Sequence, residues 1–194
     1  MEIRSFVAVE LSGEIKEKLR SLSSRLQKGA SFFPVRPSWV NSDNIHITLK
    51  FLGNVDESRI GEIKESMNLI AARAAPFTLS AAGLGVFPNR RQPRILWVGI
   101  TEGKDILVAL QKEIERKFEG LGFEREQRPF HPHLTIARLK YLKGTAALLQ
   151  VADQHQPLSE LGEWHVTEMV LFKSVLKPDG AVYTPLHKAL FTGS

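Results

Sequence analysis

The chain has 194 residues, of which 43% are hydrophobic and 24% charged, a composition that excludes disordered and fibrous proteins. Its 26 Lys and Arg exceed its 21 Asp and Glu, and the net charge of +5 favours an anionic partner such as nucleic acid or a phosphorylated small molecule. The absence of cysteine excludes disulfides, thiol nucleophiles and cysteine zinc sites.

No apolar stretch of the sequence approaches the roughly 20 residues that a membrane-spanning helix needs. The first residues, MEIRSFVAVELSGEIKEKL, carry charges at positions 2 and 4 and lack the apolar core of a signal peptide. We therefore expect a cytoplasmic protein that does not bind membranes.

Hydrophobic periodicity predicts an alternation of strands and helices in the first half of the chain. The expected elements are a strand (3–11), a helix (13–28) capped by Ser12, a strand (44–53), a helix that begins at Asp56 or Ser58, and a strand (77–87). A loop rich in proline, serine and aromatic residues (29–43) separates the first helix from the second strand.

The second half repeats this order. The expected elements are a strand (95–101), a helix (104–122), a strand (132–140), a shorter helix (143–153), and two final strands (163–176 and 181–190) joined by the hairpin signal KPDG. We therefore predict an α+β fold: a single bilobal domain over 1–194, with approximate pseudo-repeats 1–87 and 95–190. Each lobe is expected to hold an antiparallel-rich sheet and two helices, related by a pseudo-twofold axis, with the active-site cleft between the lobes.

The second strand of each half carries a His-x-Thr motif, NIHITLKFLG in the first and PHLTIARLK in the second. Side chains alternate between the faces of a strand, so His46, Thr48 and Lys50 share one face while the apolar residues, Phe51 included, share the other. His133 and Thr135 likewise point together. Two such faces meeting across a cleft would bring two imidazoles and two hydroxyls to one volume.

A pair of histidines can supply one general acid and one general base, because imidazole titrates near pH 6.5. Threonine hydroxyls can donate hydrogen bonds to phosphate oxygens. The set predicts in-line displacement at phosphorus without a metal or cofactor. Two alternatives stay open: a zinc hydrolase that uses His46, His131 and His133 as ligands, and a non-catalytic RNA-binding module.

The motifs HITL and HLTI, together with FVAVEL, NIHITLKFLGNV, GLGVFPN, RILWVGI and RPFHPHLTIAR in the same order, resemble the two-histidine phosphoesterases. Within them the chain is most similar to the RNA 2′,3′-cyclic phosphodiesterases, also called 2′-5′ RNA ligases, over nearly its whole length. The resemblance implies hydrolysis of RNA 2′,3′-cyclic phosphate ends to 2′-phosphomonoesters, with possible reversible 2′-5′ ligation. It implies that His46 is the proton donor and His133 the acceptor, and that Thr48 and Thr135 hold the phosphate.

The resemblance also implies that Arg138 binds substrate, although strict alternation places it on the opposite face from His133. We therefore expect the strand to end or bulge near Ala137. Phe6 is a candidate stacking partner for a base, or else a core residue. The loop arginines 90, 91 and 94 are more readily interpreted as a solvated turn than as RNA contacts. The expected partners are RNA or nucleotides with 2′,3′-cyclic phosphate ends, and no obligate protein partner is implied.

Overall fold

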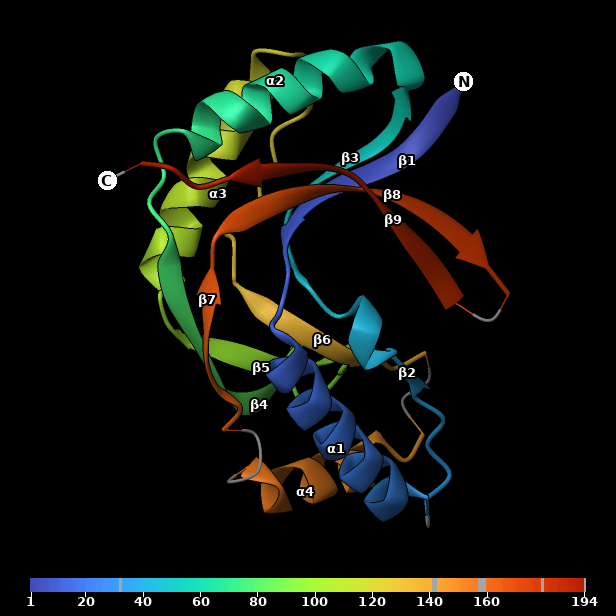
Figure 1. Ribbon diagram of the computed structural model, residues 1–194. Coiled ribbons are helices and arrows are strands. Elements are labelled where there is room, and N and C mark those ends of the chain that lie inside the picture. Colours follow the sequence, from blue (N-terminus) through green and yellow to red (C-terminus); the bar gives the residue numbers. More distant parts are fainter. Residues whose placement is uncertain (32, 141–142, 157–159, 179, 194) are drawn as a thin grey trace.

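The structure is a computed structural model that describes the chain except residues 32, 141–142, 157–159, 179 and 194 (Figure 1). The helices are α1 (Gly13–Ala30), α2 (Ile60–Ala71), α3 (Lys104–Glu119) and α4 (Thr145–Gln154), with short 3-10 helices η1 (Ser42–Asn44) and η2 (Glu57–Arg59). The strands are β1 (Glu2–Val9), β2 (Ser38–Trp39), β3 (Ile47–Asp56), β4 (Phe77–Phe87), β5 (Ile95–Glu102), β6 (His133–Arg138), β7 (Gly162–Val166), β8 (Glu168–Lys177) and β9 (Gly180–Leu190).

Two antiparallel sheets form the two lobes (Figure 1). Sheet A has the strand order β3-β1-β8-β9, and sheet B has the order β2-β6-β5-β4-β7. Helices α2 and α3 pack on sheet A, whereas α1 and α4 pack against each other beside sheet B. The predicted α+β architecture, with a sheet and two helices in each lobe, is confirmed.

Each lobe takes elements from both halves of the chain. In sheet A, β1 pairs with β3 from its own half and with β8 from the other half. In sheet B, β5 pairs with β6 from its own half and with β4 from the other. Helix α1 contacts β7, and α3 contacts β3, so the first helix of each half also lies on the opposite lobe. Each half thus contributes one helix and two strands to the lobe of the other half, and the repeat boundaries at 87 and 95 stay a prediction.

The segment 163–176, expected as one strand, is two strands in different sheets. Its first part, β7, pairs with β4 in sheet B, and its second part, β8, pairs with β1 in sheet A. Thr167 lies between them, and its carbonyl accepts a hydrogen bond from the Phe191 amide. Four successive residues of β8, 169–172, are buried, so the strand has no polar face that could have revealed the change of sheet.

The first helix forms as its sequence predicts. The Ser12 hydroxyl accepts a hydrogen bond from the Ile15 amide at 3.3 Å and caps α1. The apolar residues of α1 that recur at helical spacing are buried in the main core: Ile15, Leu19, Leu22 and Leu26. Within the described part of the chain, no helix is both long and apolar enough to span a membrane.

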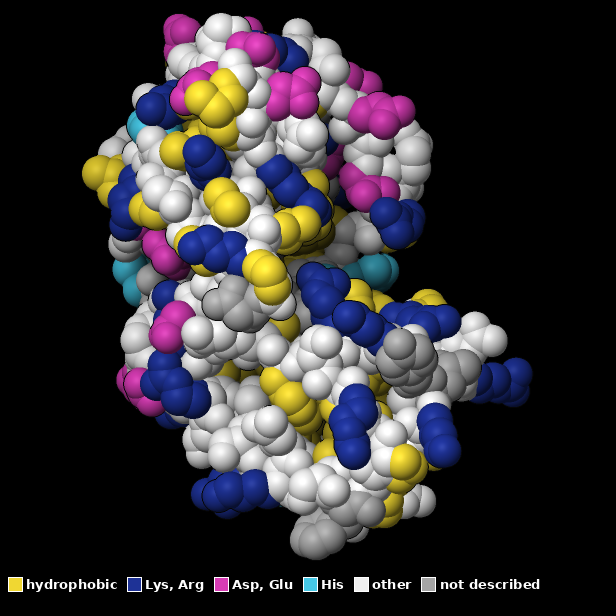
Figure 2. All heavy atoms as spheres, turned by 90° about the vertical axis from the view of Figure 1, so that its right-hand side faces the viewer, with side chains coloured by type: hydrophobic (Ala, Val, Ile, Leu, Met, Phe, Trp, Pro, Cys, Tyr) yellow, Lys and Arg dark blue, Asp and Glu magenta, His cyan; other side chains and the backbone are white. Residues whose placement is uncertain are grey.

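The faces of sheet A have different roles. Val7 and Leu171 point into the main core with the helices, whereas Phe6 and Phe172, on the alternate positions, form a separate cluster on the opposite face. That opposite face borders the hollow between the lobes that Figure 2 shows, where Lys and Arg gather around and below the opening. The fold therefore places an aromatic surface and positive charge at the junction of the two sheets.

Candidate active site

The two motif histidines are held in the same way. The Nδ1 atom of His46 lies 2.8 Å from the carbonyl oxygen of Asn44, and that of His133 lies 2.7 Å from the carbonyl oxygen of His131. A carbonyl can only accept a hydrogen bond, so each Nδ1 carries the proton. In each neutral imidazole the free lone pair is therefore on Nε2, the atom available to take up or return a proton.

The His46 ring rests on an aromatic cluster. It stacks on Phe6 with ring centroids 4.7 Å apart and an interplanar angle of 23°, and the edge of Tyr183 lies 5.2 Å away. Phe172 stacks on the other side of the cluster, 5.3 Å from Phe6. Phe6 is only 3% exposed, so in the free protein its ring supports the imidazole and is not open to a base.

The His133 ring has a matching support in sheet B. Phe87 meets it edge-on at 5.0 Å, and Trp97 lies 6.3 Å away. The indole of Trp97 lies directly over Gly85, where an added Cβ would come within 2.2 Å of the ring. These supports were not predicted from the sequence, although the glycine and the aromatic residues fall in strands that were predicted.

Burial holds both imidazoles neutral in the free protein. It lowers the pKa of His46 from its ordinary 6.5 to about 4, against the opposing effect of the Asn44 hydrogen bond. Burial also lowers the pKa of His133 below 6.5. The charge of Arg138 contributes to lowering the pKa of both imidazoles, which places its guanidinium within electrostatic reach of the two motifs.

A β-bulge in β6 turns Arg138 toward the site. The pairing of β6 with β5 shifts by one residue between Thr135 and Ala137, so that the register skips Ile136. Ile136 and Ala137 are both buried, after which Arg138 is exposed on the side of His133 and Thr135. The bulge expected near Ala137 is thus present, and the apparent conflict between alternation and the position of Arg138 disappears.

The first motif has an equivalent bulge that the sequence analysis did not predict. The pairing of β3 with β1 skips Leu49, and both Leu49 and Lys50 are buried. The expectation that Lys50 shares a face with His46 and Thr48 is therefore wrong, and so is the inward orientation of Phe51. Phe51 is 67% exposed, with its ring 6.0 Å from that of Phe6.

Because of the two bulges, equivalent residues of the two motifs point to the same side of their strands. Thr48 and Thr135, each two residues after a histidine, are half-buried on the cleft side of their strands. Five residues after each histidine, Phe51 and Arg138 are exposed at equivalent positions. Phe51 is thus a candidate substrate contact that the assumption of unbroken alternation concealed.

Buried Lys50 anchors the first motif strand to α3. Its Nζ lies 2.6 Å from a carboxylate oxygen of Glu115 and 2.8 Å from the carbonyl of Glu124. Both side chains of the ion pair are about as buried as core residues, at 3% and 5% exposure. Glu115 also accepts hydrogen bonds from Gln111 and from the Glu126 amide. This network fixes the bulge immediately after Thr48 in a single arrangement.

A cavity of about 160 Å³ opens beside His46. Phe172 and Tyr183 supply an aromatic wall, and Glu10 and Asp43 supply carboxylates. The cavity therefore offers an apolar surface and hydrogen-bond acceptors next to the first imidazole.

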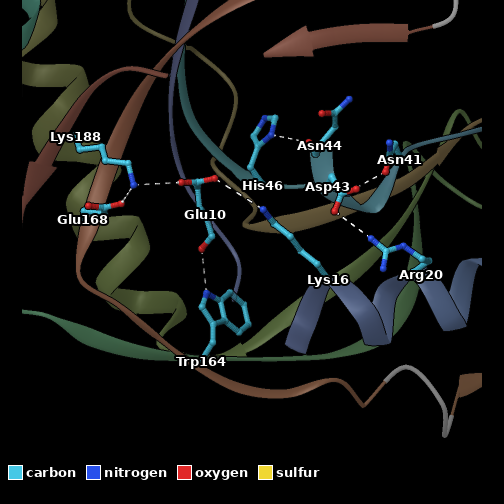
Figure 3. Close-up of polar contacts among 10 residues, drawn as sticks. All are labelled: Glu10, Lys16, Arg20, Asn41, Asp43, Asn44, His46, Trp164, Glu168 and Lys188. Carbon is cyan, nitrogen blue, oxygen red and sulfur yellow. Dashed lines mark hydrogen bonds and ion pairs between the residues drawn. The ribbon is translucent and has the colours of Figure 1, made fainter. Parts of the chain in front are cut away.

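The carboxylates of this cavity are balanced by cations (Figure 3). Glu10 lies 3.8 Å from Lys16 and 3.9 Å from Lys188, and Asp43 accepts a hydrogen bond from Arg20 at 3.0 Å. Each acid of the cavity is thus paired with at least one cation.

The structure does not assemble the three-histidine metal set. In the described residues, no group of three His, Asp or Glu side chains is close enough to hold a metal ion. His131 is exposed and contacts the Phe87 ring at 6.2 Å, and it contributes its carbonyl to the site through the bond to His133.

Known proteins resemble this chain over nearly its whole length. The family profile described as "LigT like Phosphoesterase" matches residues 9–97 and again 98–183. The chain belongs to the LigT-like phosphoesterase family. A protein named RNA 2′,3′-cyclic phosphodiesterase from Methanothermobacter thermautotrophicus is 34% identical over 186 residues, 96% of this chain and 97% of that protein.

Solved structures share the fold of this chain. The protein TT0787 of Thermus thermophilus has a TM-score of 0.79 and 27% identity, with 98% of this chain and 99% of that one covered. Escherichia coli LigT, solved in complex with 3′-AMP, has a TM-score of 0.72 and 26% identity, with 99% of each chain covered. The double match of the family profile agrees with the repeated motif geometry.

Proposed function

We propose that the protein hydrolyses RNA and nucleotide 2′,3′-cyclic phosphates to 2′-phosphomonoesters, with reversible 2′-5′ ligation as a possible second reaction. The observation that carries the proposal is the repeated arrangement of His46 and His133, each with Nδ1 bonded to the carbonyl two residues earlier. Two imidazoles that present Nε2 at equivalent positions suit a reaction with one proton removed and one proton delivered. The names of the relatives supply the substrate class.

In the proposed step a water molecule attacks phosphorus as the bond to the 3′ oxygen breaks. His133 takes the proton of the water on Nε2, and His46 gives its Nε2 proton to the departing 3′ oxygen. Thr48 and Thr135 donate hydrogen bonds to the non-bridging oxygens. These four side chains supply every proton and hydrogen bond that the step needs, so it requires no metal or cofactor.

Ligation would use the same two imidazoles, with the 5′-hydroxyl of a second RNA strand in place of water. His133 takes the proton of that hydroxyl as its oxygen bonds to phosphorus, and His46 protonates the 3′ oxygen as its bond to phosphorus breaks, which leaves a 2′-5′ linkage. In both reactions the proton donor must be an imidazolium, whereas burial keeps both rings neutral in the free protein. The anionic phosphate supplies the charge that lets one ring hold its proton.

The nucleoside of the substrate has aromatic surfaces within reach of the site. Exposed Phe51 lies on one side of the Phe6 ring that supports His46, and Tyr183 of the cavity wall lies on another. Arg138 adds a planar cation that can bind phosphate or stack on a base. The cytoplasmic location expected from composition stays a prediction, which fractionation of the source cells would test.

The experiment measures turnover of adenosine 2′,3′-cyclic phosphate in EDTA, with the 2′- and 3′-phosphate products separated. We expect 2′-AMP as the sole product and no effect of added zinc. Activity that disappears in EDTA and returns with zinc would support the three-histidine metal hydrolase instead. No turnover by folded protein, of either this nucleotide or a short RNA with the same end, would support the RNA-binding module.

A further inference from the structure

At one edge of sheet B, the last residue of β6 lies beside the first residues of its two neighbours, β2 and β5. Arg138 of β6 lies opposite Ser38 of β2 on one side and opposite Ile95 of β5 on the other. Both neighbours run antiparallel to β6, so the residues after Arg138 lie beside those that precede Ser38 and Ile95. The hydrogen bond from the Leu139 amide to the Arg94 carbonyl, at 2.8 Å, continues this ladder by one step.

This geometry gathers four exposed cations, which we call the basic edge: Arg36, Arg94, Arg138 and Lys140. Arg36 and Lys140 each lie two residues beyond the Ser38–Arg138 pair, just outside the ends of the antiparallel strands β2 and β6. In Figure 1 the end of β6 and β2 lie on the side of the molecule that Figure 2 faces, where Lys and Arg gather on the lobe below the hollow.

Among the described residues, no carboxylate forms an ion pair with the cations of the basic edge; the arginines that do form salt bridges lie elsewhere. Arg36 donates to two backbone carbonyls, at 3.1 and 3.5 Å, and Arg94 donates to the Lys140 carbonyl at 2.9 Å. These bonds leave the positive charges without a counter-charge. Arg90, in the same loop as Arg94, instead binds Asp153 with two bonds of 2.6 and 3.1 Å.

The basic edge is continuous with the active site, because Arg138 belongs to both. The charge of Arg138 reaches the two imidazoles, and the other three cations lie within two residues of its row in the sheet. An RNA strand with its cyclic end in the cleft carries one anionic phosphate for each preceding nucleotide. Arginines whose charge is not balanced by a carboxylate suit such phosphates, since their planar donors match two oxygens at once.

We propose that the basic edge binds the phosphodiester backbone of an RNA strand whose 3′ end lies in the cleft, so that the preferred substrate is an oligonucleotide and not a mononucleotide. This inference rests on the proposed function for the position of the 3′ end. Arg36, Arg94 and Lys140 act in this account as backbone contacts beyond the reacting nucleotide, and carry no base specificity.

The test compares adenosine 2′,3′-cyclic phosphate with a decanucleotide RNA that has the same end. The test variant combines Arg36→Gln, Arg94→Gln and Lys140→Gln, because glutamine keeps a donor for the carbonyls while it removes the charge. Arg90→Gln is the matched control: it removes a cation from the same loop that Asp153 already neutralises. Melting temperatures verify that both variants fold.

Each lost contact to single-stranded RNA should reduce the slope of log(kcat/KM) against log salt by about 0.7, which is about fivefold in kcat/KM at 0.1 M salt. The triple variant should thus lose about a hundredfold on the decanucleotide and keep wild-type activity on the mononucleotide. The Arg90→Gln control should keep both. Equal effects on both substrates, or no effect on the decanucleotide, would overturn the inference.

If wild-type protein turns over neither substrate, the proposed function fails, but the basic edge remains testable. Fluorescence anisotropy with a labelled decanucleotide that ends in a 2′-phosphate then measures binding directly. A loss of affinity in the triple variant alone would support the basic edge as an RNA contact. Unchanged affinity would refute it.

Discussion

Burial of the two motif imidazoles dictates how turnover should depend on pH. The active pair carries one proton, and kcat/KM reports the ionisation of the free protein. Activity should therefore rise with pH through the lower pKa, about 4 for His46, and fall above the upper pKa, which for both histidines lies below 6.5. Between pH 7 and 8.5 we expect kcat/KM to fall about tenfold for each pH unit.

Bound substrate should raise both pKa values that limit activity, because the phosphate anion favours the imidazolium. Unit charges about 4 Å apart attract by about 4 kcal/mol at an effective dielectric constant of about 20. One pKa unit corresponds to about 1.4 kcal/mol, so the shift can reach about 3 units. The kcat profile should thus be nearly level at pH 7, and the loss of kcat/KM above that pH should come from a rising KM.

The assay measures initial rates with adenosine 2′,3′-cyclic phosphate from about pH 4 to pH 9 at constant ionic strength. Circular dichroism at each pH serves as the control for folding. A value of kcat/KM that stays level or rises up to pH 8.5 would refute the reasoning, because it would mean that the proton donor is not a buried imidazole.

Three further changes test the supports of the site. Phe6→Leu removes the ring on which the first imidazole stacks; it should raise the pKa of that imidazole toward 6.5 in an NMR titration and lower kcat, and an unchanged titration would contradict the stacking role. Lys50→Met leaves the buried Glu115 carboxylate unpaired and should lower the free energy of unfolding in urea by about 3–5 kcal/mol. Adding Glu115→Leu should restore part of that stability, and no recovery would argue against coupling of the two residues. Gly85→Ala, with a Cβ 2.2 Å from the indole above it, should lower both melting temperature and kcat, whereas Gly61→Ala, which meets nothing within 4 Å, should lower neither.

Local patterns in the sequence were sufficient to predict most elements and both motifs. The bulge in β6 could be predicted only because the family resemblance implied that Arg138 binds substrate and so faces the same side as His133. The equivalent bulge in β3 could not, since no polar residue at position 51 contradicted an inward orientation. Phe51, an apolar residue on the cleft side, therefore escaped notice.

Long-range features had no local signal. The exchange of one helix and two strands between the halves depends in part on which sheet β8 joins. The buried residues 169–172 of β8 would fit the core side of either sheet, so they do not indicate which one. The aromatic supports of the imidazoles come from strands distant in sequence, such as Phe172 and Tyr183 for His46. Their role becomes visible only when sheet A is assembled.

The most direct test of the central claim is the kcat/KM of His46→Ala, His133→Ala and the double variant on adenosine 2′,3′-cyclic phosphate. If the two imidazoles act as one acid–base unit, each single variant should lose at least about a hundredfold, and the double variant should be little worse than either. Melting temperatures near that of the wild type would confirm that the fold is intact. Near-normal turnover in either single variant, or losses that multiply in the double variant, would contradict the account.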